Sequence, residues 1–220
     1  MDILKEKKRK EVIRELLTFV SASSDSFVVK GGAALEICYG SDRPTEDVNI
    51  DLVTTASNFD MLLSSYCKNK GYTFTSENFP LTQRYNMSYE DGSIMIEISN
   101  RRAHSFDRDF FIKLNGIWTY KISMLLSYAV LAYISKQRDH DLYDIMFICN
   151  NYWDSIDNRA KAIASEALSY NGHKPLSNLV KSDYYDIDMD RLERDYNNLY
   201  SKLQFNKLRP RIFVEVMPST

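Results

Sequence analysis

The sequence predicts an α+β fold in two domains: a mixed β-sheet with flanking helices over residues 1–115, followed by a helical bundle over residues 116–220. Three observations lead to this prediction. Short strand-like runs alternate with helical segments in the first half. Strand patterns fade beyond Gly116. A hydrophobic content of 44% in 220 residues is enough to fill a core without disulfides.

The N-terminal segment predicts a helix, a short strand and a second helix. Apolar residues recur with helical spacing over about residues 3–20, at Ile13, Leu16, Leu17 and Val20. A buried strand is expected at 27–29, and it stops at Gly31-Gly32, where helix-forming residues begin. The segment therefore predicts a strand, a glycine turn and a helix in direct succession.

The middle of the chain predicts more strands and one helix. Residues 47–53 alternate polar and apolar side chains, as a half-buried strand does, so that Asp47, Asn49 and Asp51 share one face. A helix over about 59–70 ends at Gly71. Strand-like segments follow at 72–75, 83–89 and 93–98, and the pair Asp91-Gly92 between the last two is typical of a hairpin.

The second half predicts helices at about 117–135, 139–150, 155–170 and 188–203. The most apolar of these segments is interrupted by Lys121, and its charge-free part is too short to cross about 30 Å of hydrocarbon. We therefore expect a central bundle helix and no membrane partner.

Charge and cysteine content restrict the function. The 28 basic and 30 acidic residues give a net charge of −2, which excludes a uniformly basic surface for nucleic acid but leaves a local basic groove open. The three cysteines are an odd number without metal-ligand spacing, which favours a reducing compartment and argues against a structural zinc site. None has a base nearby in sequence, so we expect no cysteine nucleophile. No apolar signal core follows the charged N-terminus, so we expect a cytoplasmic protein.

The turn Lys30-Gly31-Gly32 is the first candidate site. Glycines between a buried strand and a helix let the chain turn tightly and present free backbone N–H groups, which suit a phosphate. An ordinary strand-to-helix turn has the same composition, so the glycines alone do not decide between these interpretations.

Acidic residues on predicted strands are the second candidate. Asp47 begins one strand, and Glu97 is flanked by Ile96 and Ile98 in another. A carboxylate between β-branched neighbours either faces solvent or binds a cation, because burying it alone is costly. Paired strand carboxylates can hold Mg²⁺ for nucleotidyl transfer, and the alternative is a solvated face of the sheet.

Together these segments resemble the AbiEii/AbiGii toxin family of nucleotidyltransferases. Members typically show Gly-Gly-Thr-Ala-Leu, then Arg-x-Ser/Thr-x-Asp-Ile-Asp-Leu, then an acid inside a later strand. Residues 30–35, 43–51 and 96–98 follow this pattern, with Tyr39-Gly40 in between. Lys121 and residues 138–145 are similar to the family's helical lysine and to its Arg-Asp-Leu-Tyr-Asp-Leu signature. The likeness covers about residues 27–150.

The resemblance implies a polymerase-β-like nucleotidyltransferase fold followed by a helical bundle. It further implies an NTP-dependent toxin of a toxin–antitoxin or phage-defence pair, with Mg²⁺ or Mn²⁺ as cofactor, an RNA or protein acceptor, and a cognate antitoxin as partner. By position it assigns metal ligands to Asp47, Asn49 and Glu97, and a catalytic role near the nucleotide or acceptor to Asp141. It assigns nucleotide binding to Lys30, Gly31, Gly32, Lys121 and Arg138.

Two departures from the family pattern leave alternatives open. Asn49 replaces the second acid of the Asp-x-Asp pair, and an amide oxygen can ligate Mg²⁺ but brings no charge to it. Ala33 replaces a hydroxyl residue after the two glycines. A pseudoenzyme that only binds nucleotide or RNA and a pure protein-interaction module are the alternatives. A shifted Asn49/Asp51 metal pair would leave Asp47 unused.

Two further segments have competing interpretations. Asp141 and Asp144 share a helix face, where they could serve catalysis, or could cap the bundle or join it to the first domain by salt bridges. The stretch 101–113 mixes basic and aromatic residues, which suits either an RNA acceptor or a solvated connector.

Overall fold

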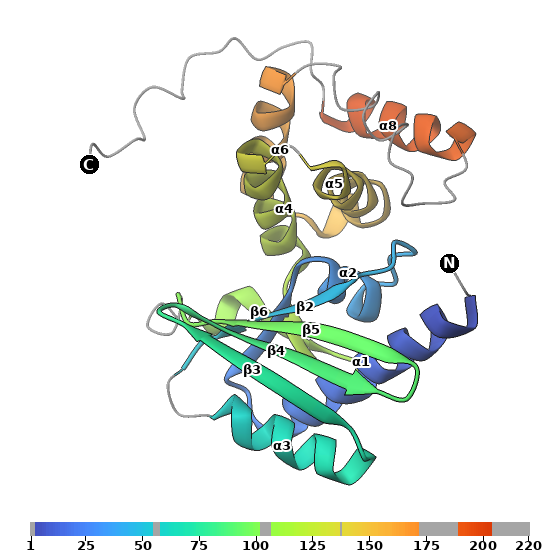
Figure 1. The fold of residues 1–220 in the computed structure, drawn as a ribbon. Helices are drawn as coiled ribbons and strands as arrows, with labels where there is room; N and C mark the ends of the chain where they lie inside the picture. Colours follow the sequence, from blue (N-terminus) through green and yellow to red (C-terminus); the bar gives the residue numbers. More distant parts are fainter. Residues whose placement is uncertain (1–2, 55–57, 102–106, 137, 172–188, 204–220) are drawn as a thin grey trace. The chain divides into compact units, whose positions relative to one another are not determined.

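The computed structural model describes residues 3–54, 58–101, 107–136, 138–171 and 189–203 (Figure 1). It consists of two compact units, Met1–Lys121 and Ile122–Thr220. The first unit contains a mixed sheet with helices and the second is helical, so the predicted α+β class is confirmed.

The first unit is built on a seven-stranded sheet in the order β3-β4-β5-β2-β1-β7-β6. β2 pairs in parallel with β5, β1 pairs in parallel with β7, and the other neighbours are antiparallel. The strands are β1 (Phe27–Lys30), β2 (Asp47–Leu52), β3 (Thr73–Phe79), β4 (Thr82–Tyr89), β5 (Gly92–Ser99), β6 (Phe111–Leu114) and β7 (Ile117–Tyr120). The helices are α1 (Ile3–Ser23), α2 (Gly31–Cys38) and α3 (Phe59–Lys70), with a short 3-10 helix at Arg108–Phe110.

The core of this unit lies between α1, α3 and one face of the sheet (Figure 1). The apolar stripe expected on the first helix is completely buried, at Ile13, Leu16, Leu17 and Val20. Phe59 of α3 packs edge-on against Phe27 and near Tyr85. Because strand side chains alternate, the polar residues of β2, β4 and β5 are directed to the opposite face.

The segment around Gly116 corrects the sequence prediction. A helix was expected from 117, but residues 117–120 form β7, and α4 begins only at Ile122. Asn115 and Gly116 both have positive φ, 49° and 84°, the combination that a type I′ hairpin turn requires. β7 belongs to the sheet, so the first unit extends to Lys121, and the division expected after residue 115 falls inside the β6–β7 hairpin.

The second unit contains the helices α4 (Ile122–Lys136), α5 (Asp139–Tyr152), α6 (Asn158–Asn171) and α8 (Met189–Leu203), with a 3-10 turn at Trp153–Ser155. Leu126, Val130, Ile145 and Ile148 are buried between them. Lys202 Nζ donates to the carbonyls of Cys149 and Asn150, at 3.0 and 3.2 Å, and so ties α8 to the C-terminal end of α5. Within the part of the chain that the structure describes, no helix has the length and apolar character needed to cross a membrane.

Candidate functional site

The glycine turn joins β1 directly to α2. Lys30 has extended backbone angles and its side chain does not cap the helix. Gly31 follows at φ 64°, a left-handed conformation that favours glycine, and a Cβ there would meet nothing within 4 Å. The sequence prediction of a strand, a glycine turn and a helix is confirmed, and the first turn of α2 lacks a side-chain cap from Lys30.

Gly32 has a different neighbourhood. A Cβ at this position would lie 2.6 Å from Arg43 Nη2 and 2.9 Å from Thr45 Oγ1. The missing side chain therefore makes room for the buried Arg43, which sequence reasoning had used only as part of a motif. A substitution at Gly32 would meet Arg43 and Thr45 before it met any ligand.

Thr45 connects this loop to α2 and to β2. Its backbone N–H donates to Glu36 Oε2 at 2.9 Å, and its hydroxyl donates to the carbonyl of Asp47 at 2.9 Å. Glu36 is buried and also lies 3.7 Å from Lys10 Nζ of α1. The backbone at Asp47 is thus fixed relative to α2 by buried polar contacts.

Asp47, Asn49 and Glu97 share the polar face of the sheet. Asn49 Nδ2 donates to Asp47 Oδ2 at 2.9 Å, which confirms that alternate residues of β2 point the same way. Glu97 lies directly opposite Asn49 on the parallel strand β5. The structure therefore brings together the three residues that the resemblance assigns to metal binding.

Asp51 has a structural role instead. It is 1% exposed, forms an ion pair with Lys30 Nζ, and accepts a 2.7 Å hydrogen bond from the Tyr120 hydroxyl. Tyr39 in turn donates to the carbonyl of Tyr120 at 2.8 Å. The Asn49/Asp51 metal pair considered from the sequence is therefore wrong. Lys30 is engaged by Asp51, and its expected contact with nucleotide stays a prediction.

Arg84 is a site residue that sequence reasoning missed. It lies opposite Glu97 on β4, and its Nε donates to Glu97 Oε2 at 2.9 Å. The sheet register therefore places Lys30, Asn49, Glu97 and Arg84 in one row across four neighbouring strands. In this row Glu97 is the single acidic residue and lies between the Asn49 amide and the Arg84 guanidinium.

The donor set fits a magnesium ion that is shared with substrate phosphates. Mg²⁺ prefers hard oxygen ligands and is usually bound through one or two carboxylates plus phosphates. Asp47 and Glu97 supply two carboxylates and Asn49 one amide oxygen. The described ranges contain no cluster of three or more histidine, cysteine or acidic side chains suited to a metal. Asp47 and Glu97 thus bring two negative charges to this face, and Asn49 brings none.

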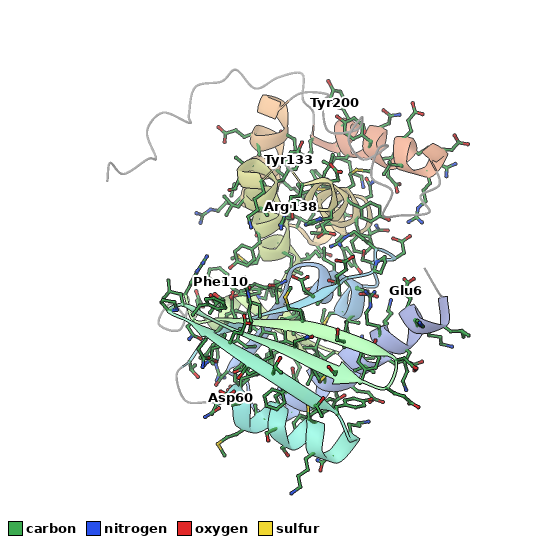
Figure 2. The ribbon with its side chains drawn as sticks, in the orientation of Figure 1. Glu6, Asp60, Phe110, Tyr133, Arg138 and Tyr200 are labelled. Carbon is green, nitrogen blue, oxygen red and sulfur yellow. The ribbon has the colours of Figure 1, made fainter. Side chains whose placement is uncertain are left out.

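Lys121 lies outside the helix in which it was expected, and Arg138 and Asp141 are bonded to each other. Lys121 is exposed and lies between β7 and α4, so it is not inside a helix as predicted. In the second unit Arg138, labelled in Figure 2, donates to both carboxylate oxygens of Asp141, at 2.9 and 3.0 Å. Asp141 is buried, and His140 Nε2 lies 3.6 Å from its Oδ1. Asp141 is thus paired with Arg138 inside the second unit. Its expected salt bridge to the first domain and its catalytic role stay predictions, as do the nucleotide contacts of Lys121 and Arg138.

The basic and aromatic stretch is engaged in local contacts where the structure describes it. Arg108 pairs with Asp25 at 2.8 Å, and Lys113 Nζ lies 5.5 Å from the centre of the Trp118 ring. Residues 102–106 of this stretch lie outside the described residues.

Burial raises the pKa of the Cys38 thiol to about 12 and likewise that of Cys149, so both stay protonated and make poor nucleophiles.

Comparisons with known proteins identify the family and the fold of the chain. Residues 16–214 match the family of the nucleotidyl transferase AbiEii toxin of type IV toxin–antitoxin systems. The fold is similar to JHP933 from Helicobacter pylori, with a TM-score of 0.74 and 18% identity, over 91% of this chain and 90% of that one. It is also similar to an H. pylori structure assigned as a nucleotidyltransferase, with a TM-score of 0.70 and 19% identity, over 89% and 92% of the two chains. A comparison with curated protein sequences finds no significant match. The fold is a nucleotidyltransferase fold.

Proposed function

Because the chain belongs to the AbiEii nucleotidyltransferase toxin family, we propose that it is an Mg²⁺-dependent enzyme that transfers a nucleotide from an NTP to an RNA or protein hydroxyl. Its physiological partner is then the cognate antitoxin. The observation that carries the proposal is the juxtaposition of Asp47, Asn49 and Glu97 on adjacent strands, beside the glycine turn that begins α2.

Each residue has a role in this proposal. The uncapped first turn of α2 at Gly31 and Gly32 binds the triphosphate through backbone N–H groups. Asp47 and Glu97, with Asn49 between them, hold the cation. Mg²⁺, when bound, would neutralise charge on the phosphate oxygens. The buried contacts of Thr45 keep Asp47 at a fixed place relative to the turn, and Lys121, Arg138 and Asp141 serve the nucleotide or acceptor.

One observation favours a second candidate, a protein that binds nucleotide without efficient transfer. The Asn49 amide donates a hydrogen bond to the Asp47 carboxylate, at the position where the family pattern has a second carboxylate. The site therefore carries one negative charge fewer, and a second cation would be held weakly.

Two measurements separate these functions. Isothermal titration with each NTP, with and without Mg²⁺, is expected to show Mg²⁺-dependent binding. Incubation with labelled NTPs and total cellular RNA or protein is expected to place label in the macromolecular fraction. Binding without incorporation would favour the second candidate, and absence of both would leave a protein-interaction module.

A further inference from the structure

Arg84 stands out on the polar face of the first unit because of what surrounds it. Its Nε is bonded to Glu97, and its guanidinium lies 5.0 Å from the centre of the Phe79 ring on β3. The Arg84 side chain is 49% exposed and Phe79 is 44% exposed. Among the described residues, the terminal nitrogens Nη1 and Nη2 of Arg84 have no protein partner. The pair thus offers an accessible cation and an accessible aromatic ring beside a proposed metal ligand.

The position of this pair in the sheet separates it from the glycine turn. The turn follows β1, the candidate metal ligands lie on β2 and β5, and Arg84 follows on β4. Neighbouring strands are about 4.8 Å apart, so Arg84 lies roughly 14 Å from the Lys30 strand, with the metal ligands in between. In nucleotidyl transfer the attacking and leaving oxygens are roughly in line on opposite sides of the phosphorus. If the pyrophosphate leaves on the side of the glycine turn, the acceptor approaches on the side of Arg84.

The chemistry of the pair matches a nucleic-acid acceptor better than a protein side chain. A guanidinium with two free nitrogens can grip a phosphate through paired hydrogen bonds. Aromatic side chains on an open sheet face stack unpaired bases, and each such contact contributes substantially to binding. A protein hydroxyl acceptor would bring neither a phosphate nor a base to this position.

We propose that Arg84 and Phe79 form the acceptor-binding patch, and that the acceptor is single-stranded RNA whose phosphate contacts Arg84 while a base stacks on Phe79. The inference rests on the proposed function and narrows its acceptor from RNA or protein to RNA. In the absence of RNA, Glu97 holds the guanidinium in place.

The test measures binding rather than turnover. Fluorescence anisotropy of a labelled single-stranded RNA with a free 3′ hydroxyl is followed against the full chain without metal, at several salt concentrations. Arg84→Gln should weaken RNA binding about tenfold and reduce the salt slope by about one, since one phosphate contact is lost. Phe79→Leu should weaken binding about tenfold with no change in the salt slope. Arg84→Lys keeps the positive charge but not the paired nitrogens of the guanidinium, so its RNA affinity should lie between those of the parent chain and Arg84→Gln.

Lys70→Gln is the matched control. Lys70 lies on α3, away from the polar face of the sheet, and pairs with Glu15, so its substitution also removes one exposed positive charge but should change RNA affinity by less than about twofold. Titration of Mg²⁺–NTP should give the same affinity for the parent chain, Arg84→Gln and Phe79→Leu.

The outcomes are distinct. Unchanged RNA affinity in Arg84→Gln would overturn the inference, and so would a loss of Mg²⁺–NTP affinity, which would assign Arg84 to the triphosphate. If the parent chain binds Mg²⁺–NTP but not RNA, the inference fails and the proposed function stands. If it binds RNA through Arg84 and Phe79 but no NTP, the patch is real and the proposed function fails.

Discussion

Replacing Asn49 by aspartate should have opposite effects in the absence and in the presence of Mg²⁺. The Asn49 amide donates to Asp47 Oδ2 over 2.9 Å, and the substitution replaces this bond, worth about 1 kcal/mol net, by a contact between two carboxylates. Two unit charges 4 Å apart repel by about 1 kcal/mol in water and about 4 kcal/mol at an effective dielectric of 20. Because both residues are half-buried, we expect Asn49→Asp to lower the metal-free free energy of unfolding by about 2–5 kcal/mol.

Mg²⁺ should reverse this loss. A ligand present at a hundredfold excess over its dissociation constant stabilises the folded state by about 2.7 kcal/mol, and a second carboxylate makes that constant smaller. Urea unfolding of both forms across a Mg²⁺ series measures the effect. Nucleotide transfer should increase at least tenfold, equivalent to about 1.4 kcal/mol of barrier, as counted by label from NTP in the macromolecular fraction.

The control for charge alone is Asn86→Asp. Asn86 lies on the same face, two strands from Asp47, and is exposed. A carboxylate there should leave the Mg²⁺ dependence at the level of the parent chain. Identical Mg²⁺ dependence and equal incorporation by Asn49→Asp and the parent chain would refute the view that Asn49 is a weakened metal ligand.

Three further predictions concern stability. Gly32→Ala should lower both the melting temperature and the NTP affinity, because its Cβ would lie 2.6 Å from Arg43 Nη2, and Arg43→Ala in the same chain should restore part of the melting temperature; strict additivity would contradict this contact. Asp51→Asn should cost about 3–5 kcal/mol in urea unfolding, because it leaves the Lys30 ammonium without its buried partner; a cost below about 1 kcal/mol would argue against the pair. Asp157→Ala should cost about 1 kcal/mol at pH 7, since its carboxylate accepts the Ala160 N–H at the start of α6. That bond lowers the pKa of Asp157, so its contribution is present above about pH 4 and is lost as the pH falls through the folded-state pKa; the difference between the two chains should shrink toward pH 3, and a constant difference would disprove the assignment.

Most of the fold could be predicted from local patterns, and the exceptions have a physical cause. In long periodic segments such as α1 and α3, the spacing of the apolar residues alone predicts which side of the helix is buried. β6 and β7 have only four residues each. Only Lys121 separates β7 from the apolar α4, so the residues of β7 resemble the first turn of a helix. The pair Asn115-Gly116 was the available signal, because both residues accept positive φ in a hairpin turn.

The candidate site was predictable where it depends on local sequence and not where it depends on register. The glycine turn and the alternation of Asp47 and Asn49 follow from neighbouring residues. Arg84 was missed because a turn at the pair Asp91-Gly92 would place it opposite Ser99. The structure pairs Tyr89 with Gly92 instead, so that the turn lies at Glu90 and Asp91 and Arg84 lies opposite Glu97. The contact between Arg43 and Gly32 depends on the path of a loop, and no periodicity in the sequence encodes that path.

The parallel pairing of β7 with β1 has a consequence for the order in which the first unit can form. Val29 lies opposite Thr119, and the Thr119 side-chain hydroxyl donates to the carbonyl of Val29 at 3.1 Å across a separation of 90 residues. During synthesis β1 therefore has an open apolar edge until β7 has left the ribosome, and such non-local pairing is slow to form. Tyr120, which bonds the buried Asp51, arrives with the same strand. A nascent chain that stops at residue 115 would present the backbone of β1 to other chains and would be prone to aggregate. A chain that continues to Lys121 can pair β1 with its own β7.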